Sequence, residues 1–138
     1  MHTRIVQVKL NFQYAHNSHE ESEDKSIQDV EDALLSFDNF DWAGEAAKAI
    51  ELQKCSPTLS LIISEHKEYI WVSAFEDNGS LTFVSECHFP GVVPSWFGLS
   101  KKEGIVGLST QTLSTSKARK VIEHFIKKEH DSLRVMYA

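Results

Sequence analysis

The chain has 138 residues, of which 41% are hydrophobic, enough for the core of one globular domain spanning the whole sequence. It has no apolar window of about 18 residues, which excludes a conventional membrane-spanning helix. The alternating N-terminal segment lacks the apolar stretch of a signal peptide, so a cytoplasmic protein is expected. Cys55 and Cys87 have neither metal-binding nor redox spacing.

The net charge of −6 is unevenly distributed. Residues 16–51 contain eleven acidic side chains and two lysines, a net charge of −9, whereas residues 101–138 contain eight basic and four acidic side chains, a net charge of +4. An acidic segment repels nucleic acid and attracts basic partners. It is also typical of an ordinary solvated surface, and the charge pattern alone favours that simpler interpretation.

The N-terminal segment predicts a strand followed by a loop. Apolar residues alternate with polar ones over Ile5–Phe12, as in a half-buried strand. Residues 13–25 are polar and acidic, so an exposed acidic loop is expected there. His16 and His19 beside Glu20 form only a weak metal-ligand pattern, and no metal site is expected.

Two helices are predicted next. Ser26 is a suitable N-cap with Asp29 at the capping-box position. The apolar residues that follow fall at helical spacing: Ile27, Val30, Leu34 and Phe37. After an interruption at Asp38-Asn39, residues 42–52 predict a second helix, with Trp42 as a packing residue.

The central prediction is a β-hairpin over residues 69–89, preceded by a strand over residues 58–64. Asn78-Gly79 suits the two positive-φ positions of a type I′ turn, and aromatic and β-branched residues dominate both arms. This turn fixes the register: Asp77 pairs with Ser80, and further out Trp71 pairs with Glu86 and Tyr69 with His88.

The register divides the hairpin side chains between two faces. The core face is formed by Ile70, Val72, Ala74, Leu81, Phe83 and Cys87. The mixed face is formed by Tyr69, Trp71, Phe75, Thr82, Val84, Glu86 and His88. The mixed face is either a recognition surface or a surface half-covered by a helix or loop, and the burial tendency of large aromatic side chains favours the second interpretation.

The remaining segments complete an α+β fold. Residues 90–98 predict a loop, in which Trp96 and Phe97 either form interface anchors or fold back on the sheet edge. Residues 105–108 predict a strand with a bulge or a close backbone approach at Gly104 and Gly107. A helix capped by Ser114 or Thr115 follows, with His124 and His130 at its surface.

The last residues predict a terminal strand, because Leu133, Val135 and Tyr137 alternate with Arg134 and Met136. The expected fold class is therefore α+β, with a mainly antiparallel sheet of about five to six strands. N-terminal helices and one C-terminal helix are expected to pack on that sheet.

Motifs for chemistry are absent from the sequence. It contains no nucleophile elbow, zinc-peptidase motif, phosphate-binding loop, dinucleotide fingerprint or Cys/His zinc spacing. The basic C-terminal helix lacks the interleaved aromatic residues of an RNA or DNA reader. We therefore expect neither an enzyme nor a nucleic-acid-binding protein, and no cofactor.

The order and texture of several segments resemble those of a known family. These are an acidic N-terminal helix, the aromatic hairpin WVSAFEDNGSLTFV, the strand GIVGLS and the helix STSKARKVIEHFI. Together they resemble the immunity proteins of bacterial polymorphic-toxin and contact-dependent growth inhibition systems. The texture is most similar to that of the first immunity superfamily, which accompanies nuclease and deaminase toxins.

The resemblance implies inhibition by binding to a cognate, basic toxin domain, without membrane or nucleic-acid contact. The candidate partner contacts are then of three kinds. Glu20, Glu21, Glu23 and Asp24 are expected to act as steering charges, Trp71 and Glu86 as contacts on the mixed face, and Trp96 and Phe97 as apolar anchors. Two rival hypotheses remain. One is a ligand-binding or minor enzymatic domain with a pocket near Tyr69, Trp71 and His88. The other is a structural module that pairs through an exposed strand edge.

Overall fold

The computed structural model describes residues 4–14, 23–52, 56–64, 67–94 and 101–138. Six strands form one antiparallel sheet in the order β2-β1-β3-β4-β5-β6, which confirms the predicted α+β class. The strands are β1 (Arg4–Gln13), β2 (Glu23–Asp29), β3 (Thr58–Ser64), β4 (Glu68–Asp77), β5 (Ser80–Pro94) and β6 (Lys101–Leu113).

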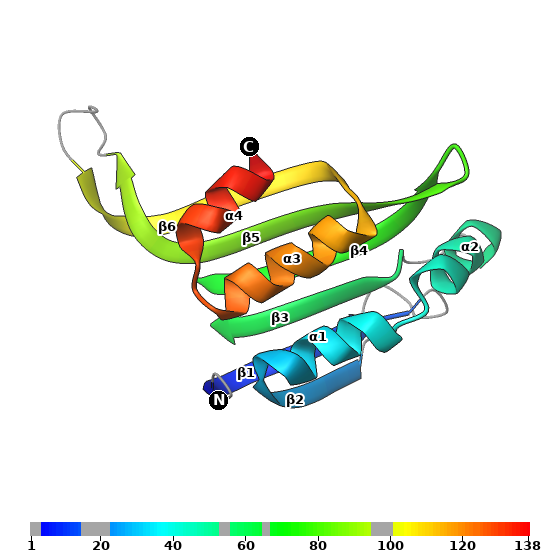
Figure 1. Cartoon of the computed structure of the whole chain (residues 1–138), viewed down its shortest axis with the longest axis horizontal. Coiled ribbons are helices and arrows are strands. Elements are labelled where there is room, and N and C mark those ends of the chain that lie inside the picture. The colour runs from blue at the N-terminus through cyan, green and yellow to red at the C-terminus, as the bar shows by residue number, and fades with distance from the viewer. Residues whose placement is uncertain (1–3, 15–22, 53–55, 65–66, 95–100) are drawn as a thin grey trace.

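The helices lie on one side of this sheet (Figure 1). They are α1 (Val30–Asn39), α2 (Trp42–Leu52), α3 (Thr115–Ile126) and α4 (His130–Tyr137). Helices α1, α3 and α4 lie across one face, and α2 lies near the end of the sheet. The Trp42 ring at the start of α2 is 5.0 Å from the Phe83 ring and belongs to the same core. No helix within the described ranges is long and apolar enough to cross a membrane.

The central hairpin has the predicted register. Asp77 pairs with Ser80, and the pairing continues without a shift to Tyr69 and His88. Asn78 and Gly79 have φ angles of 52° and 82°, the left-handed conformation that a type I′ turn requires at both positions. Local turn chemistry therefore determines which hairpin side chains face the helices.

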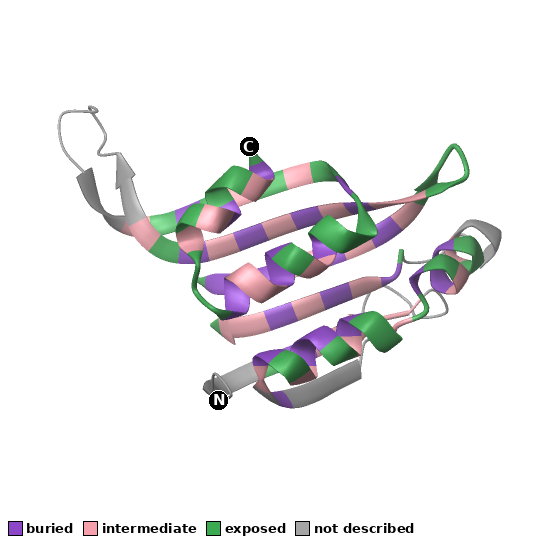
Figure 2. Cartoon of the chain, viewed as in Figure 1, coloured by how far each residue is buried: buried purple, intermediate pink, exposed green. Residues whose placement is uncertain are grey.

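Burial alternates along the strands (Figure 2). On β4 and β5, the predicted core face contains the buried side chains of Ile70, Val72, Ala74, Phe83 and Cys87, with Leu81 half-buried. Five apolar residues of α3 pack over this face and are all buried: Ala118, Val121, Ile122, Phe125 and Ile126. The Ser114 hydroxyl caps α3 by accepting a hydrogen bond from the Lys117 amide, as the sequence predicts.

The N-terminal boundaries differ from the prediction. Gln13 belongs to β1, and residues 23–25, expected in the acidic loop, belong to β2, which pairs with β1. Because this pairing keeps the backbone extended as far as Asp29, Ser26 is not the N-cap of α1. Asp29 takes that role, and its carboxylate accepts a hydrogen bond of 2.8 Å from the Asp32 amide.

The predicted C-terminal strand is wrong, because residues 130–137 form α4 and thus a second C-terminal helix. Leu133 and Tyr137 fit a period of four as well as a period of two, and both are buried. Val135 distinguishes the two patterns, since it is 76% exposed and takes no part in the core. His130 is also no simple surface residue, because its ring stacks on Phe89 with centroids 4.0 Å apart.

The loop predicted over residues 90–98 begins later than expected. Strand β5 continues to Pro94 and pairs with β6, while residues 95–100 lie outside the described part of the chain. No register shift occurs at Gly104 or Gly107; the irregularity in this pair of strands lies between Phe83 and Ser85. Gly107 does provide a close approach, because a Cβ atom there would lie 3.1 Å from the His88 ring.

Candidate partner-binding face

The sheet surface opposite the helices contains the predicted mixed face. Every residue of that face on β4 and β5 is partly exposed, in contrast to the buried residues that alternate with them. We call this surface the open face. It comprises Tyr69, Trp71, Phe75, Thr82, Val84, Glu86 and His88, flanked by Ser60 and Ile62 of β3 and Ser109 of β6. Within the described ranges, no helix lies across it (Figure 1).

Trp71 and Glu86 occupy the middle of the open face. They are direct cross-strand partners on β4 and β5, so two of the residues predicted for partner binding lie side by side. The Trp71 backbone is held from the core side, where the Ser85 hydroxyl donates a hydrogen bond of 2.8 Å to its carbonyl oxygen. The indole is therefore carried by rigid backbone while its side chain stays partly accessible.

Next to this pair, the His88 ring is held by two contacts and by the lack of a side chain at a neighbouring position. Its Nε2 lies 2.6 Å from Oε1 of Glu86, two residues earlier on the same strand. The Tyr69 ring stacks on it with centroids 4.7 Å apart and an interplanar angle of 22°. Gly107, its cross-strand neighbour on β6, lacks the side chain that would displace the imidazole. These contacts fix the orientation of both His88 and the Glu86 carboxylate.

The Glu86–His88 pair remains accessible to water. The side chains are 37% and 25% exposed, respectively, so both polar groups can be approached from the open face. Burial, and then the Glu86 carboxylate, raise the pKa of the neighbouring Tyr69 hydroxyl, which keeps it a neutral hydrogen-bond donor. Aromatic rings around a fixed carboxylate suit recognition of a cationic side chain by stacking and a charge-assisted hydrogen bond.

The other residues predicted for partner binding are not placed beside Trp71. The backbones of Glu23 and Asp24 lie in β2, which β1 and β3 separate from β4. At the usual strand spacing, this separation is about 14 Å. Glu20, Glu21, Trp96 and Phe97 lie outside the described residues. Glu23 and Asp24 therefore lie at the edge of the sheet, and the described acidic residues from Glu31 to Glu51 lie in or between α1 and α2, away from the centre of the open face.

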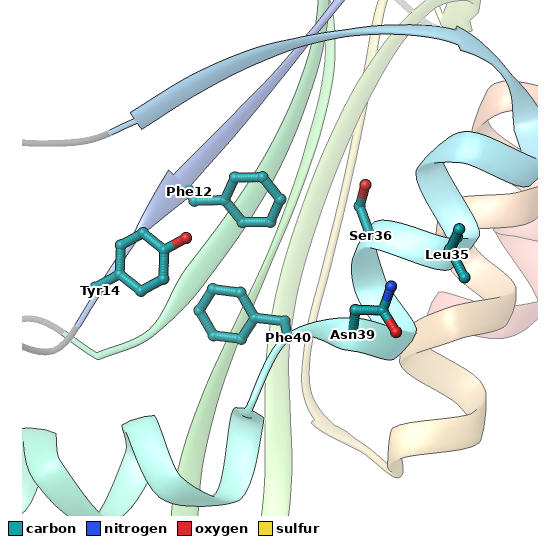
Figure 3. Close-up of a pocket in the computed structure, with 6 residues that line it drawn as sticks. All are labelled: Phe12, Tyr14, Leu35, Ser36, Asn39 and Phe40. Atoms are coloured by element: carbon teal, nitrogen blue, oxygen red, sulfur yellow. The ribbon is translucent and has the colours of Figure 1, made fainter.

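A pocket that the sequence did not predict lies beside the last turn of α1 (Figure 3). It has a volume of about 250 Å³ and is lined by Phe12, Tyr14, Leu35, Ser36, Asn39 and Phe40. The rings of Phe12, Tyr14 and Phe40 form a near-parallel cluster, with centroids 5.3 to 6.2 Å apart. This cavity therefore lies at a different place from the ligand pocket predicted near Tyr69, Trp71 and His88.

The described part of the chain contains no group of three or more His, Cys, Asp or Glu side chains placed to hold a metal ion. Comparison with known proteins also gives no assignment: no family model, curated protein or solved structure matches the chain.

Proposed function

We propose that this chain is a cytoplasmic inhibitor that binds a basic protein domain and blocks its activity. Following the resemblance described above, the partner is a cognate toxin domain of the nuclease or deaminase class. Toxins that act on nucleic acid are commonly basic. The observation that carries the proposal is the open face, where aromatic side chains surround a fixed and accessible carboxylate.

The open face has the composition of a binding surface. Tryptophan and tyrosine contribute large apolar area with few rotatable bonds, and they are enriched among residues that dominate binding energies. Trp71 and Tyr69 are both partly exposed on a continuous antiparallel sheet. Because a sheet surface needs little ordering on association, less of the interaction free energy is lost to conformational entropy.

The charge distribution supports a basic partner. The net charge of −9 over residues 16–51 speeds the association of a positively charged domain, mainly by steering the encounter. Glu86 provides a specific contact for an arginine or lysine of the partner in the middle of the face. Steering and contact are then carried by separate parts of the molecule, because the described acidic residues of this segment lie in or between β2, α1 and α2, whereas Glu86 lies on β5.

The proposal is tested by titrating the purified partner domain against variants of the open face. Trp71→Leu and Glu86→Gln are each expected to weaken binding at least about tenfold, the usual scale for central interface residues. Glu129→Gln is a matched control, because Glu129 also contacts a histidine, His124 at 3.0 Å, but belongs to the helix layer. Equal affinity of all three variants and the parent protein would exclude the open face as the binding surface.

A second candidate function is the binding of a small planar ligand, which the pocket beside α1 favours. Its three aromatic rings offer stacking surfaces, and Ser36 and Asn39 add polar groups. Native mass spectrometry of the freshly purified protein tests this function. Leu35→Trp changes the exposed rim of the pocket, and Val135→Trp on α4 is its control. A ligand that is retained by the parent protein and by Val135→Trp but lost from Leu35→Trp would support this function.

A further inference from the structure

The two edges of the sheet differ sharply in charge. Strand β2 forms one edge and β6 forms the other. Four of the seven residues of β2 are charged: Glu23, Asp24, Lys25 and Asp29. By contrast, residues 104–113 of β6, with the sequence GIVGLSTQTL, contain neither a charged residue nor a proline. Natural edge strands usually carry such residues to prevent pairing with another chain.

The neutral edge is also accessible. Strand β6 pairs with β5 on one side, and no strand of the described residues pairs with its other side. Ile105 is 41% exposed, a large apolar side chain that this edge leaves in contact with water. Gly107, Ser109, Gln111 and Thr112 are exposed as well. This segment therefore has the features of a strand that pairs with a further strand.

We infer that β6 is a dimerisation edge, where β6 of a second copy of this chain pairs with it in antiparallel orientation. A twofold axis perpendicular to the sheet at Ser109 places each Ser109 opposite its counterpart and residue 105 opposite residue 113. The product is one continuous sheet of twice six strands, with both open faces on the same side. This inference does not depend on the proposed inhibitory function.

Charge argues for a second copy at this edge and against other occupants. A charged partner strand is disfavoured, because residues 104–113 offer no opposite charge for it to pair with. Self-pairing through β2 would bring its three carboxylates close to those of the other copy. Self-pairing through β6 opposes only neutral residues over residues 104–113, and the charged residues Lys101, Lys102 and Glu103 precede that segment in the sequence. Because each copy carries a net charge of −6, salt that screens the repulsion between the two copies is expected to tighten the dimer.

Sedimentation velocity of the purified protein over a wide concentration range tests the inference. A monomer–dimer equilibrium is expected, and Ser109→Lys should weaken it at least roughly tenfold by placing two lysines directly opposite each other. Ser80→Lys is the control, since it adds the same charge at an exposed position beside the hairpin turn, away from β6. A monomer at every concentration, or a dimer that both variants affect equally, would overturn the inference.

Hydrogen exchange of the unmodified chain gives a second readout that does not depend on how a variant folds. Amides within residues 104–113 should exchange more slowly at concentrations where the dimer dominates, while those of β2 should not change. Slower exchange confined to any other element would place the contact elsewhere and contradict the inference. Neither experiment needs a toxin, so the dimer can be established or excluded whether or not the proposed function holds.

Discussion

The hydroxyl group of Tyr137 lies 2.6 Å from Oγ of Ser85, although the two residues are 52 positions apart in the sequence. The Ser85 hydroxyl donates its single proton to the carbonyl oxygen of Trp71, so Tyr137 is the donor in the bond between the two hydroxyls. This chain of hydrogen bonds connects α4 through the core to the strand that carries Trp71. The last helix thereby supports the open face from behind.

Tyr137→Phe should lower the free energy of unfolding by about 1 to 2 kcal/mol, because it leaves the buried Ser85 oxygen without its donor. Equilibrium denaturation with urea measures the change. Val135→Ala on the same helix is the control and should have little effect, since Val135 is exposed. Equal stability of the parent and Tyr137→Phe would show that this hydrogen bond contributes nothing net.

The Cys87 thiol should be unreactive in the folded protein. Burial raises its pKa from 9.0 to about 11, with Glu86 adding to the increase and Tyr137 opposing it. In a Cys55→Ser background, a thiol-specific disulfide reagent at pH 8 should therefore label the unfolded chain quickly and the native chain slowly. Rapid stoichiometric labelling under native conditions would contradict the buried position of this side chain.

The same thiol makes stability depend on pH. Between pH 9 and pH 11, the unfolded chain loses the thiol proton while the folded chain retains it, so the free energy of unfolding falls as pH rises. The full loss is on the order of 3 kcal/mol, and the raised pKa of Tyr137 adds to it above pH 10. In Cys87→Ala, the free energy of unfolding should decline less steeply between pH 9 and pH 10. An unchanged slope would mean that other groups cause the pH dependence.

Gly107→Ala should disturb the open face without a large loss of stability. The new Cβ atom would lie 3.1 Å from the His88 ring, which cannot retreat because Tyr69 stacks on it. We expect the His88–Glu86 hydrogen bond to lengthen, with altered ring-current shifts of His88 and Tyr69 in NMR spectra. Ser109→Ala, on the same strand and face, should leave both sets of signals in place. Identical spectra for Gly107→Ala and the parent would mean that the glycine has no role in holding the imidazole.

Gly79→Ala should destabilise the protein by about 1 to 2 kcal/mol through backbone conformation alone. Gly79 has a φ angle of 82°, and a Cβ atom there would meet no atom within 4 Å. A steric clash therefore cannot explain any loss that thermal or urea denaturation reveals. Ser80→Ala is the neighbouring control and should be nearly neutral. If both substitutions lower the free energy of unfolding equally, the positive φ angle is not the reason for the loss at residue 79.

The hairpin was predictable because its determinants are local. Asn78-Gly79 sets the turn, and the alternation of residues on either side sets the faces, so the register required no information from other segments. Strand β2 was not predictable in the same way. Its polar sequence EDKSIQD has no alternating apolar pattern, and its strand conformation depends on pairing with β1.

The candidate site was predictable only in part. The turn register predicts that Trp71 lies beside Glu86. Whether a helix covers that face depends on the packing of the helices, which no local sequence pattern predicts. The aromatic pocket combines Phe12 and Tyr14 from one end of β1 with Phe40 from the α1–α2 connection. Segments separated in sequence come together there only through the tertiary fold, so no spacing of residues signals the pocket.

The proposed function requires that the open face bind and inhibit a basic partner protein. Co-expression of this chain with the toxin-like product of a neighbouring gene, followed by affinity purification and a growth assay, tests it most directly. We expect a one-to-one complex and restored growth, both lost in Trp71→Leu combined with Glu86→Gln and both retained in Glu129→Gln. Recovery of the folded protein without any partner, or rescue that persists in the double variant, would contradict it.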